Sequence, residues 1–197
     1  MSGLIVLDYG AGNIKSVTNI LDKLGCTYKL TDKKEEILEA DKIILPGQGH
    51  FGQFMESLSS KGLTDALIYK INSGVPFLGI CLGIQVLFEE SEEAPGVKGL
   101  SIFPGKVVKF TEGKVPQIGW NKLKTTENNS ILTDEYVYFV NSYYVVPENK
   151  EIISSYSDYY IDFVASIESK NVSAFQFHPE KSGEVGFEFF KRWIEIY

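Results

Sequence analysis

Cys81 lies between two glycines in segment 79–83 (GICLG), where an apolar run ends and a helical pattern begins. This is the layout of a nucleophile elbow, with Cys where Ser is more common. Such a nucleophile sits on a tight, strained turn, so we expect the residues two positions away to be glycines, to avoid a collision with it. The N–H groups of the following helix would favour the thiolate, and that of Leu82 can also stabilise an oxyanion. The alternative is a buried structural thiol, which is our interpretation of Cys26.

His178 and Glu180 flank Pro179 just after the apolar run 172–177. A cysteine nucleophile needs a base within hydrogen-bonding reach, and the base needs an orienting group. Side chains two residues apart in an extended chain point the same way, and Pro179 favours an extended backbone. The carboxylate can then hold one imidazole nitrogen while the other faces Cys81. A His at a strand end can be structural, but beside the elbow it predicts a Cys81–His178–Glu180 triad.

Segment 46–49 (PGQG) follows another apolar run and is the third candidate element. The carboxyl edge of a parallel sheet is where α/β proteins place ligands, and glycines there let main-chain N–H groups point into an oxyanion hole. A plain strand-ending turn is the alternative interpretation. His50, directly after it, is a competing candidate base, which we disfavour because no carboxylate adjoins it in the sequence to orient its ring.

These elements need a scaffold, and the first half of the chain alternates strand-like and helix-like patterns. The continuous apolar runs 4–7, 42–45 and 75–80 are typical of strands buried on both faces of a parallel sheet. Helical spacing is found over 14–24, 58–71 and 82–90, with Asn13 as a candidate N-cap and Gly25 as a stop. Strand alternating with helix indicates right-handed βαβ units and a three-layer α/β fold.

From Lys106 onward the pattern changes to short segments rich in β-branched and aromatic residues, with turn signals between them. The strands predicted here are 107–110, 137–141, 152–156, 163–167 and 172–177, followed by a helix at about 186–196. This half is predicted to add antiparallel strands to the parallel core. The fold class is therefore α/β, with a three-layer, mostly parallel mixed sheet. No linker divides the chain, so residues 1–197 are predicted to form a single domain.

Composition excludes several classes of function. The 197 residues are 44% hydrophobic and carry a formal net charge of −7, which argues against binding to nucleic acid or an anionic membrane. The longest apolar runs are far too short to span a bilayer. With two cysteines and two histidines, no disulfide framework is expected and a zinc site would need nearly all four residues. We expect a cytoplasmic protein without a metal or another cofactor.

The Pro-Gly turn, the Gly-x-Cys-x-Gly elbow and the late His-Pro-Glu, in this order, resemble the class I (triad) glutamine amidotransferases. Further segments spread over nearly the whole chain look like the family of glutaminase subunits of imidazole glycerol phosphate synthase. These segments are 8–13 (DYGAGN), 89–100 (EESEEAPGVKGL), 119–121 (GWN), 138–144 (YFVNSYY) and 176–182 (QFHPEKS). Two positions depart from the family's pattern, since Gln48 replaces a residue that is often hydrophobic and Asn141 replaces an expected His.

The resemblance implies a reaction. Cys81 would attack the side-chain amide of glutamine, and the γ-glutamyl thioester would be hydrolysed to glutamate. His178 would accept the thiol proton and later deliver one to the leaving ammonia, while Glu180 would orient His178. The other implied roles are an oxyanion hole made by the main-chain N–H groups of Gln48, Gly49 and Leu82, and a glutamine-binding set of Gly47, Gln85, Ser142 and Tyr143.

The ammonia implies a partner, because free ammonia in water near neutral pH is mostly ammonium, which is not a nucleophile. The chain has no phosphate-binding Gly-x-x-x-x-Gly-Lys loop, so the acceptor site must lie elsewhere. In the resembled family the acceptor site lies on a (β/α)₈-barrel cyclase subunit, which forms a heterodimer with the glutaminase subunit. The cyclase makes imidazole glycerol phosphate and an aminoimidazole carboxamide ribotide in histidine biosynthesis. Asn13, Trp120 and Lys181 match positions facing that partner. Glutamine hydrolysis is expected to be weak until the partner binds its nucleotide ligand.

Three alternatives stay open. A paralogous glutaminase subunit would supply ammonia to a different barrel partner, for instance in surface-sugar modification. A cysteine hydrolase or peptidase would act alone, and an inactive subunit would serve only as a binding scaffold. Labelling of Cys81 by a glutamine-analogue electrophile would separate the enzymes from the scaffold.

Overall fold

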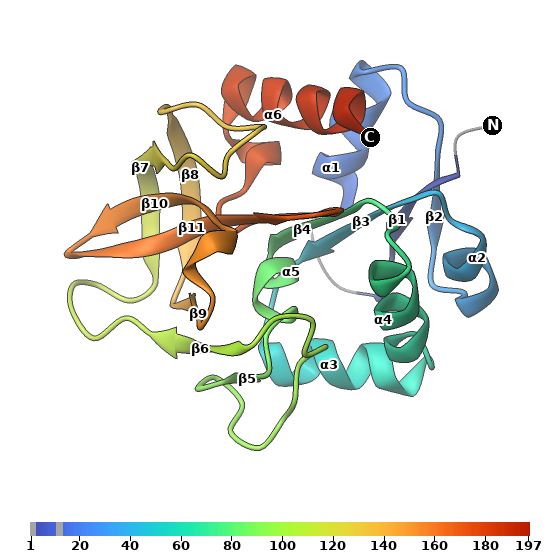
Figure 1. Ribbon diagram of the computed structural model, residues 1–197, viewed down its shortest axis with the longest axis horizontal. Coiled ribbons are helices and arrows are strands. Elements are labelled where there is room, and N and C mark those ends of the chain that lie inside the picture. The colour runs from blue at the N-terminus through green and yellow to red at the C-terminus, as the bar shows by residue number, and fades with distance from the viewer. Residues whose placement is uncertain (1–2, 11–13) are drawn as a thin grey trace.

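The computed structural model describes residues 3–10 and 14–197. Within these residues, nine strands form one mixed sheet in the order β2-β1-β3-β4-β12-β11-β10-β7-β8, and three more form a small sheet in the order β5-β6-β9. The large sheet crosses the middle of the molecule, and helices lie above and below it (Figure 1). The candidate N-cap Asn13 falls outside the described residues.

The first half of the large sheet is parallel, and its strands inside the edge strand β2 are buried on both faces. Its strands are β1 (Leu4–Leu7), β2 (Tyr28–Thr31), β3 (Lys42–Gly47), β4 (Phe77–Cys81) and β12 (Val172–Phe175). Every residue of β1, β4 and β12 is buried, as the continuous apolar runs predicted. Gly47 pairs with Cys81, so the Pro-Gly turn and the elbow begin side by side at one edge of the sheet.

The second half is antiparallel and extends from β12. Its strands are β11 (Ile161–Ser169), β10 (Ile153–Tyr159), β7 (Gln117–Thr125) and β8 (Tyr136–Asn141), and the small sheet consists of β5 (Glu90–Ser91), β6 (Gly105–Lys109) and β9 (Tyr143–Pro147). The prediction of added antiparallel strands is confirmed. Strands β2, β5, β7 and β9 were not predicted. Strand β5 has only two residues, and much of β2 and β7 is exposed, so these strands lack the continuous apolar signal.

Helices cover both faces of the sheet, which confirms the three-layer prediction (Figure 1). One face carries α1 (Ile14–Lys23) and α6 (Gly183–Ile196); the other carries α2 (Lys34–Glu39), α3 (Phe51–Ser60), α4 (Thr64–Asn72) and α5 (Leu82–Gln85). Side chains of β1 alternate between the two cores, because successive residues of a strand point to opposite faces. No helix among the described residues is long and apolar enough to cross a membrane.

Two predicted helices are wrong in extent. The single helix predicted over 58–71 is two helices in the structure, because its range covers the end of α3 and most of α4. Gly62, with φ of 67°, permits the break between them. The pattern over 82–90 stays helical only to Gln85. Residues 86–88 are fully buried rather than presenting one apolar face, and the chain folds back so that Leu100 N–H donates to Val86 C=O at 2.7 Å. Cys26, predicted to be core, is only half-buried.

Candidate active site

Cys81 ends β4 in a strained conformation, with φ of 55° and ψ of −106°, and α5 begins at the next residue. A Cβ on Gly79 would lie 2.7 Å from the carbonyl oxygen of Gly83, and a Cβ on Gly83 would collide with the carbonyl oxygen of Leu45 in β3. The strained strand-turn-helix elbow predicted from the sequence is therefore confirmed. The glycines were expected to avoid a collision with the nucleophile. This reason is wrong, because Gly79 and Gly83 instead make room for neighbouring backbone.

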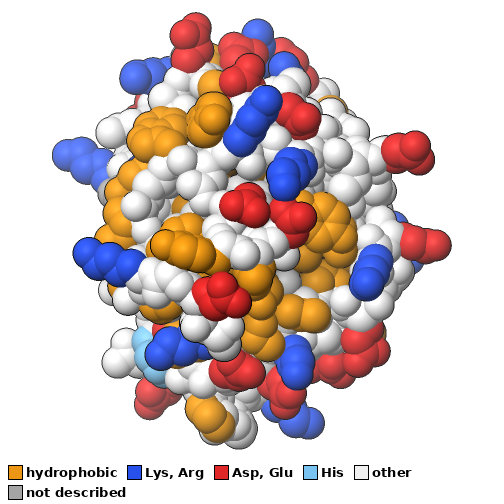
Figure 2. All heavy atoms as spheres, turned by 90° about the vertical axis from the view of Figure 1, so that its left-hand side faces the viewer, with side chains coloured by type: hydrophobic (Ala, Val, Ile, Leu, Met, Phe, Trp, Pro, Cys, Tyr) orange, Lys and Arg blue, Asp and Glu red, His pale blue; other side chains and the backbone are white. Residues whose placement is uncertain are grey.

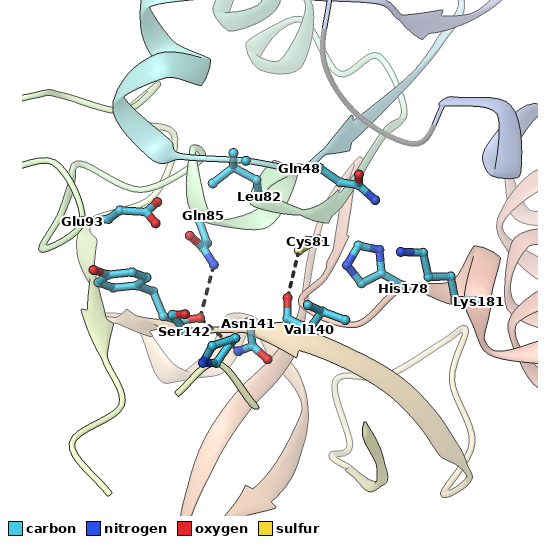
Figure 3. Close-up of a pocket in the computed structure, with 13 residues that line it drawn as sticks. Gln48, Cys81, Leu82, Gln85, Glu93, Val140, Asn141, Ser142, His178 and Lys181 are labelled. Atoms are coloured by element: carbon cyan, nitrogen blue, oxygen red, sulfur yellow. Dashed lines mark hydrogen bonds between the residues drawn. The ribbon is translucent and has the colours of Figure 1, made fainter. Parts of the chain in front are cut away.

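His178 and Glu180 are in direct contact. The Nδ1 of His178 lies 2.7 Å from Oε1 of Glu180, and both side chains are 3% exposed. The predicted extended backbone holds at His178, with φ of −101° and ψ of 91°, but it is wrong from Pro179 onward, where a 3-10 turn, η2, covers Pro179–Lys181. The contact is made by this turn instead. In Figure 3 the imidazole of His178 lies next to Cys81, and with Nδ1 held by Glu180 its Nε2 is the nitrogen free to face the thiol.

Opposing effects act on the protonation of His178. Burial by itself would lower the pKa of His178, because it disfavours the charged imidazolium. The interactions of the imidazole with Cys81 and with the Glu180 carboxylate outweigh burial and raise the pKa to about 10. These contacts therefore favour the protonated form of His178.

A hydrogen-bonded chain of two glutamines reaches the sulfur from the other side. Gln85 Nε2 donates to Gln176 Oε1 at 3.0 Å, and Gln176 Nε2 donates to Cys81 Sγ at 3.8 Å. Gln85 is 4% exposed, so its side chain belongs to the buried part of the site. Gln176 was missed as a site residue, although it lies two positions before His178 in the apolar run 172–177, where a buried amide needs a partner.

These groups open into a cavity of about 400 Å³, within the size range of small-molecule sites. Its lining includes nine of the residues predicted from the sequence: Gln48, Gly49, Cys81, Leu82, Gln85, Ser142, Tyr143, His178 and Lys181. It also includes Glu93, Pro116, Val140 and Asn141. Glu180 lies behind His178, and Gly47 lies behind the turn, where a Cβ would meet Leu82 Cβ at 2.7 Å.

Glu93 places a carboxylate in the cavity wall opposite the thiol end (Figure 3). Its Oε2 accepts a hydrogen bond from the Phe51 N–H at 2.7 Å, which anchors the loop carrying it to the start of α3. Sequence reasoning missed this residue, because it stands in an acidic run that is usually a solvated face. The second oxygen of its carboxylate remains able to bind a cationic group.

Asn141, the departure from the family pattern, is 6% exposed in the cavity floor. Its Nδ2 donates to the Tyr143 carbonyl at 3.0 Å, the same carbonyl that accepts from Gln85 at 3.2 Å. Asn141 therefore helps fix the main chain of the predicted glutamine-binding stretch. Its neighbour in the sheet register, Gln117, is 1% exposed.

The Gln48–Gly49 turn forms the opposite wall. Gly49 has φ of 101°, a conformation that glycine adopts without strain. The hydroxyl of Tyr9 accepts a hydrogen bond from Gln48 N–H at 3.0 Å and donates one to Gln48 C=O at 3.3 Å. The competing base His50 does not line the cavity: its Nδ1 accepts from Gly52 N–H at 3.1 Å and caps α3.

An apolar surface continues outward from the cavity along β7 and β8. Trp120 is 50% exposed and packs edge-on against Tyr138, with ring centroids 5.8 Å apart; Ile118 and Tyr136 are 61% and 57% exposed. Figure 2, which faces this end of the molecule, shows hydrophobic side chains spread between charged ones. Lys181, exposed beside His178, stands at the mouth of the cavity (Figure 3).

The described residues contain no group of three or more His, Cys, Asp or Glu side chains that could hold a metal ion.

Comparison with known proteins places this geometry in a family. A family model described as glutamine amidotransferase class-I matches residues 5–194. The chain is 45% identical to imidazole glycerol phosphate synthase subunit HisH of Methanothermobacter thermautotrophicus, over 98% of both chains. It is 46% identical to imidazole glycerol phosphate synthase hisHF, chloroplastic, of Arabidopsis thaliana, over 98% of this chain and 34% of the plant protein.

Solved structures agree on the fold. A crystal structure of a glutamine amidotransferase superposes with a TM-score of 0.78 at 20% identity, covering 98% of this chain and 97% of the other. PurLQS from Thermotoga maritima gives a TM-score of 0.73 at 18% identity, covering 98% and 97%.

Proposed function

The chain belongs to the class-I glutamine amidotransferases, in the family of imidazole glycerol phosphate synthase subunit HisH, and we propose that it acts as one domain in which Cys81, His178 and Glu180 hydrolyse glutamine. Relatives that share this name and more than 40% of the sequence come from archaea and bacteria alike. The observation that carries the proposal is the strained Cys81 beside a His178–Glu180 pair in one cavity.

In the first half of the reaction, the Cys81 thiolate attacks the side-chain amide carbon of glutamine. The tetrahedral intermediate carries a negative oxygen, which main-chain N–H groups of Leu82 and the Gln48–Gly49 turn stabilise. His178 holds the proton taken from the thiol and delivers it to the departing nitrogen, which leaves as ammonia. Glu180, at 2.7 Å from Nδ1, keeps Nε2 aimed at the reacting atoms throughout.

In the second half, water attacks the γ-glutamyl thioester. His178 takes a proton from the water, the carbon–sulfur bond breaks, and glutamate leaves with Cys81 restored as thiolate. The sum of both halves is one glutamine and one water giving one glutamate and one ammonia. Gln176, through its 3.8 Å contact with Sγ, supports the thiolate at the start and the end of this cycle.

The rest of the cavity suits the amino-acid end of glutamine. Glu93 offers a carboxylate to the substrate α-ammonium group, and Ser142 and Tyr143 form the facing wall. Gln85 and Asn141 hold that wall by both donating to the Tyr143 carbonyl. Under this proposal Gln85 holds the main chain of Tyr143 in place. Its amide nitrogen already donates to Tyr143 and Gln176, so only its amide oxygen is left to bind substrate.

Ammonia would then pass to a second chain. The relatives are named subunits, and the plant protein, of which this chain matches 34%, carries hisHF in its name. The exposed Ile118, Trp120 and Tyr136 provide an apolar patch of the kind that protein partners bury, beginning beside the cavity wall at Val140. Under this proposal a barrel-shaped cyclase subunit binds at this patch and forms a heterodimer with this chain in the cytoplasm. Lys181 would then lie between the glutaminase cavity and the acceptor site of the partner.

The test is glutamate release by the purified chain, alone and with a histidine-pathway cyclase subunit plus its nucleotide ligand, with Cys81→Ala as the blank. Strong stimulation that vanishes in the variant supports the proposal. Release that ignores the cyclase indicates a paralogue with another acceptor. No release under any condition indicates an inactive subunit.

A further inference from the structure

Two hydrogen bonds with opposite consequences meet at the sulfur of Cys81. The thiol donates to the Val140 carbonyl, with Sγ 3.9 Å from the oxygen, and Gln176 Nε2 donates to Sγ at 3.8 Å. A carbonyl oxygen can bind only the protonated thiol, whereas an amide N–H that points at the sulfur favours the thiolate. The protonation of Cys81 therefore responds to any change in the strength of either contact.

Gln176 is the last member of a chain of amides whose hydrogen bonds run in one direction. Its Oε1 accepts from Gln85 Nε2 at 3.0 Å, and Gln85 Nε2 also donates to the Tyr143 carbonyl at 3.2 Å. Gln176 is fully buried and Gln85 is nearly so. In such surroundings the hydrogen bonds of one chain polarise one another, because little water is present to screen them. A charge at one end of the chain therefore acts at the other end.

The free end of the chain is the amide oxygen of Gln85. Both N–H groups of this amide are engaged, so the oxygen is the atom left for a ligand. Gln85 and Glu93 line the same cavity, and in Figure 3 the Gln85 oxygen lies on the side of Glu93. A carboxylate and an amide oxygen are both acceptors that bind a cationic group. Under the proposed function, that cation is the α-ammonium group of glutamine.

We propose that Gln85 and Gln176 form a relay that couples recognition of the substrate α-ammonium group to ionisation of the Cys81 thiol. The inference rests on the proposed glutaminase function. An α-ammonium group that donates to Gln85 Oε1 draws electron density toward that oxygen, which makes Gln85 Nε2–H a stronger donor to Gln176. Gln176 Nε2–H then binds the sulfur more strongly, the thiol proton passes to His178 Nε2, and the contact with Val140 is lost. The relay thus activates the nucleophile for an amide that carries an amino-acid end.

The test compares glutamine with glutaramate, which has the same amide and carboxylate but no α-ammonium group, in the wild type and in Gln176→Met. Methionine has a similar volume and no N–H, so this variant cuts the relay before the sulfur. The value of kcat/KM should fall for both substrates, by about tenfold more for glutamine than for glutaramate. A structural Gln176 would lower both values by the same factor, which would overturn the relay. The matched control Gln53→Met, at an exposed position of α3, should change neither value.

A binding measurement separates the relay from a displaced Gln85. Norvaline carries the α-ammonium and α-carboxylate groups of glutamine but no amide, so it binds without reacting. Its Kd should be the same for Cys81→Ala and for Cys81→Ala/Gln176→Met, because neither variant has a sulfur on which the relay can act. A weaker Kd in the double variant would assign the kinetic effect to a displaced Gln85 and overturn the relay.

A second measurement leaves Gln176 unchanged. A thiolate absorbs ultraviolet light more strongly than a thiol, and Cys81→Ala supplies the blank. At neutral pH norvaline should raise the thiolate absorbance of the wild type, whereas pentanoate, which lacks the α-ammonium group, should not. An equal response to both ligands, or to neither, overturns the relay. Absence of Cys81-dependent glutamate release by the wild type, even with its partner, would instead refute the proposed function on which the relay rests.

Discussion

The two walls of the active-site cavity are held in place by different means. The elbow carrying Cys81 is fixed by backbone packing, since Gly79 and Gly83 leave no room for even a Cβ. The turn carrying Gln48 is held by the hydroxyl of Tyr9, beside a small cavity. Packing of this kind is not reversible without unfolding, whereas hydrogen bonds of about 1 kcal/mol each can be exchanged.

The difference separates what must stay constant from what can respond. A nucleophile works only at one position, so the protein fixes it with close contacts between β3, β4 and α5. A turn held by hydrogen bonds can shift while the nucleophile stays in place. Substitutions can perturb each of the two walls separately.

Replacing the nucleophile tests whether the elbow geometry has any catalytic value without its thiol. Cys81→Ala should lower glutamine hydrolysis by about 10⁴-fold or more, with and without the partner. Glutamate release measures this, and ammonium salt supplied in place of glutamine is the control. The partner's own reaction should then proceed equally with variant and wild type; a residual glutaminase rate near the wild-type rate would refute the assignment.

Filling the elbow's backbone contact tests whether packing fixes it. Gly83→Ala would push a methyl group into the Leu45 carbonyl, so the free energy of unfolding should fall by about 3 kcal/mol. Gly74→Ala, at φ of 87° with open space around it, is the matched control and should cost about 1 kcal/mol. Urea unfolding measures both, and equal losses would show that packing is not what holds the elbow.

Removing the carboxylate behind His178 tests the electrostatics on the elbow side. Glu180→Gln keeps a hydrogen-bond acceptor but loses the charge, and kcat should fall about 100-fold. The Glu180 charge raises the pKa of His178, so its loss lowers that pKa. The alkaline limb of the pH–rate profile, where His178 loses the proton needed by ammonia, should therefore move to lower pH. A limb that stays in place would mean that Glu180 only orients the ring.

The smallest effect is expected outside the cavity. Trp120→Ala should weaken binding of the cyclase subunit by about tenfold, because an exposed aromatic side chain is a frequent anchor of interfaces. Unstimulated hydrolysis and stability should hardly change. Tyr69→Ala on α4, where the ring is 62% exposed, is the matched control for partner affinity. Equal affinities of both variants would place the partner elsewhere.

Local patterns sufficed for the elements that carry the nucleophile. The apolar runs ending at Cys81 and at Pro46 predicted parallel strands, because strands buried on both faces need apolar residues at every position. Strands β7 and β9 escaped prediction, since half-exposed strands have weaker patterns. The helical pattern past Gln85 misled for the opposite reason, because burial on all sides also produces apolar residues at helical spacing.

The chemistry can be read from the order of the residues: a thiol between glycines, a His and a carboxylate two residues apart, and a Pro-Gly turn. How these groups meet depends on the packed fold. The fold forms a 3-10 turn over Pro179–Lys181 where an extended segment was expected, brings Gln176 to the sulfur, and sets Tyr9 against Gln48 across 39 positions of sequence. Contacts between residues so far apart depend on how sheets and helices pack, and no local spacing encodes them.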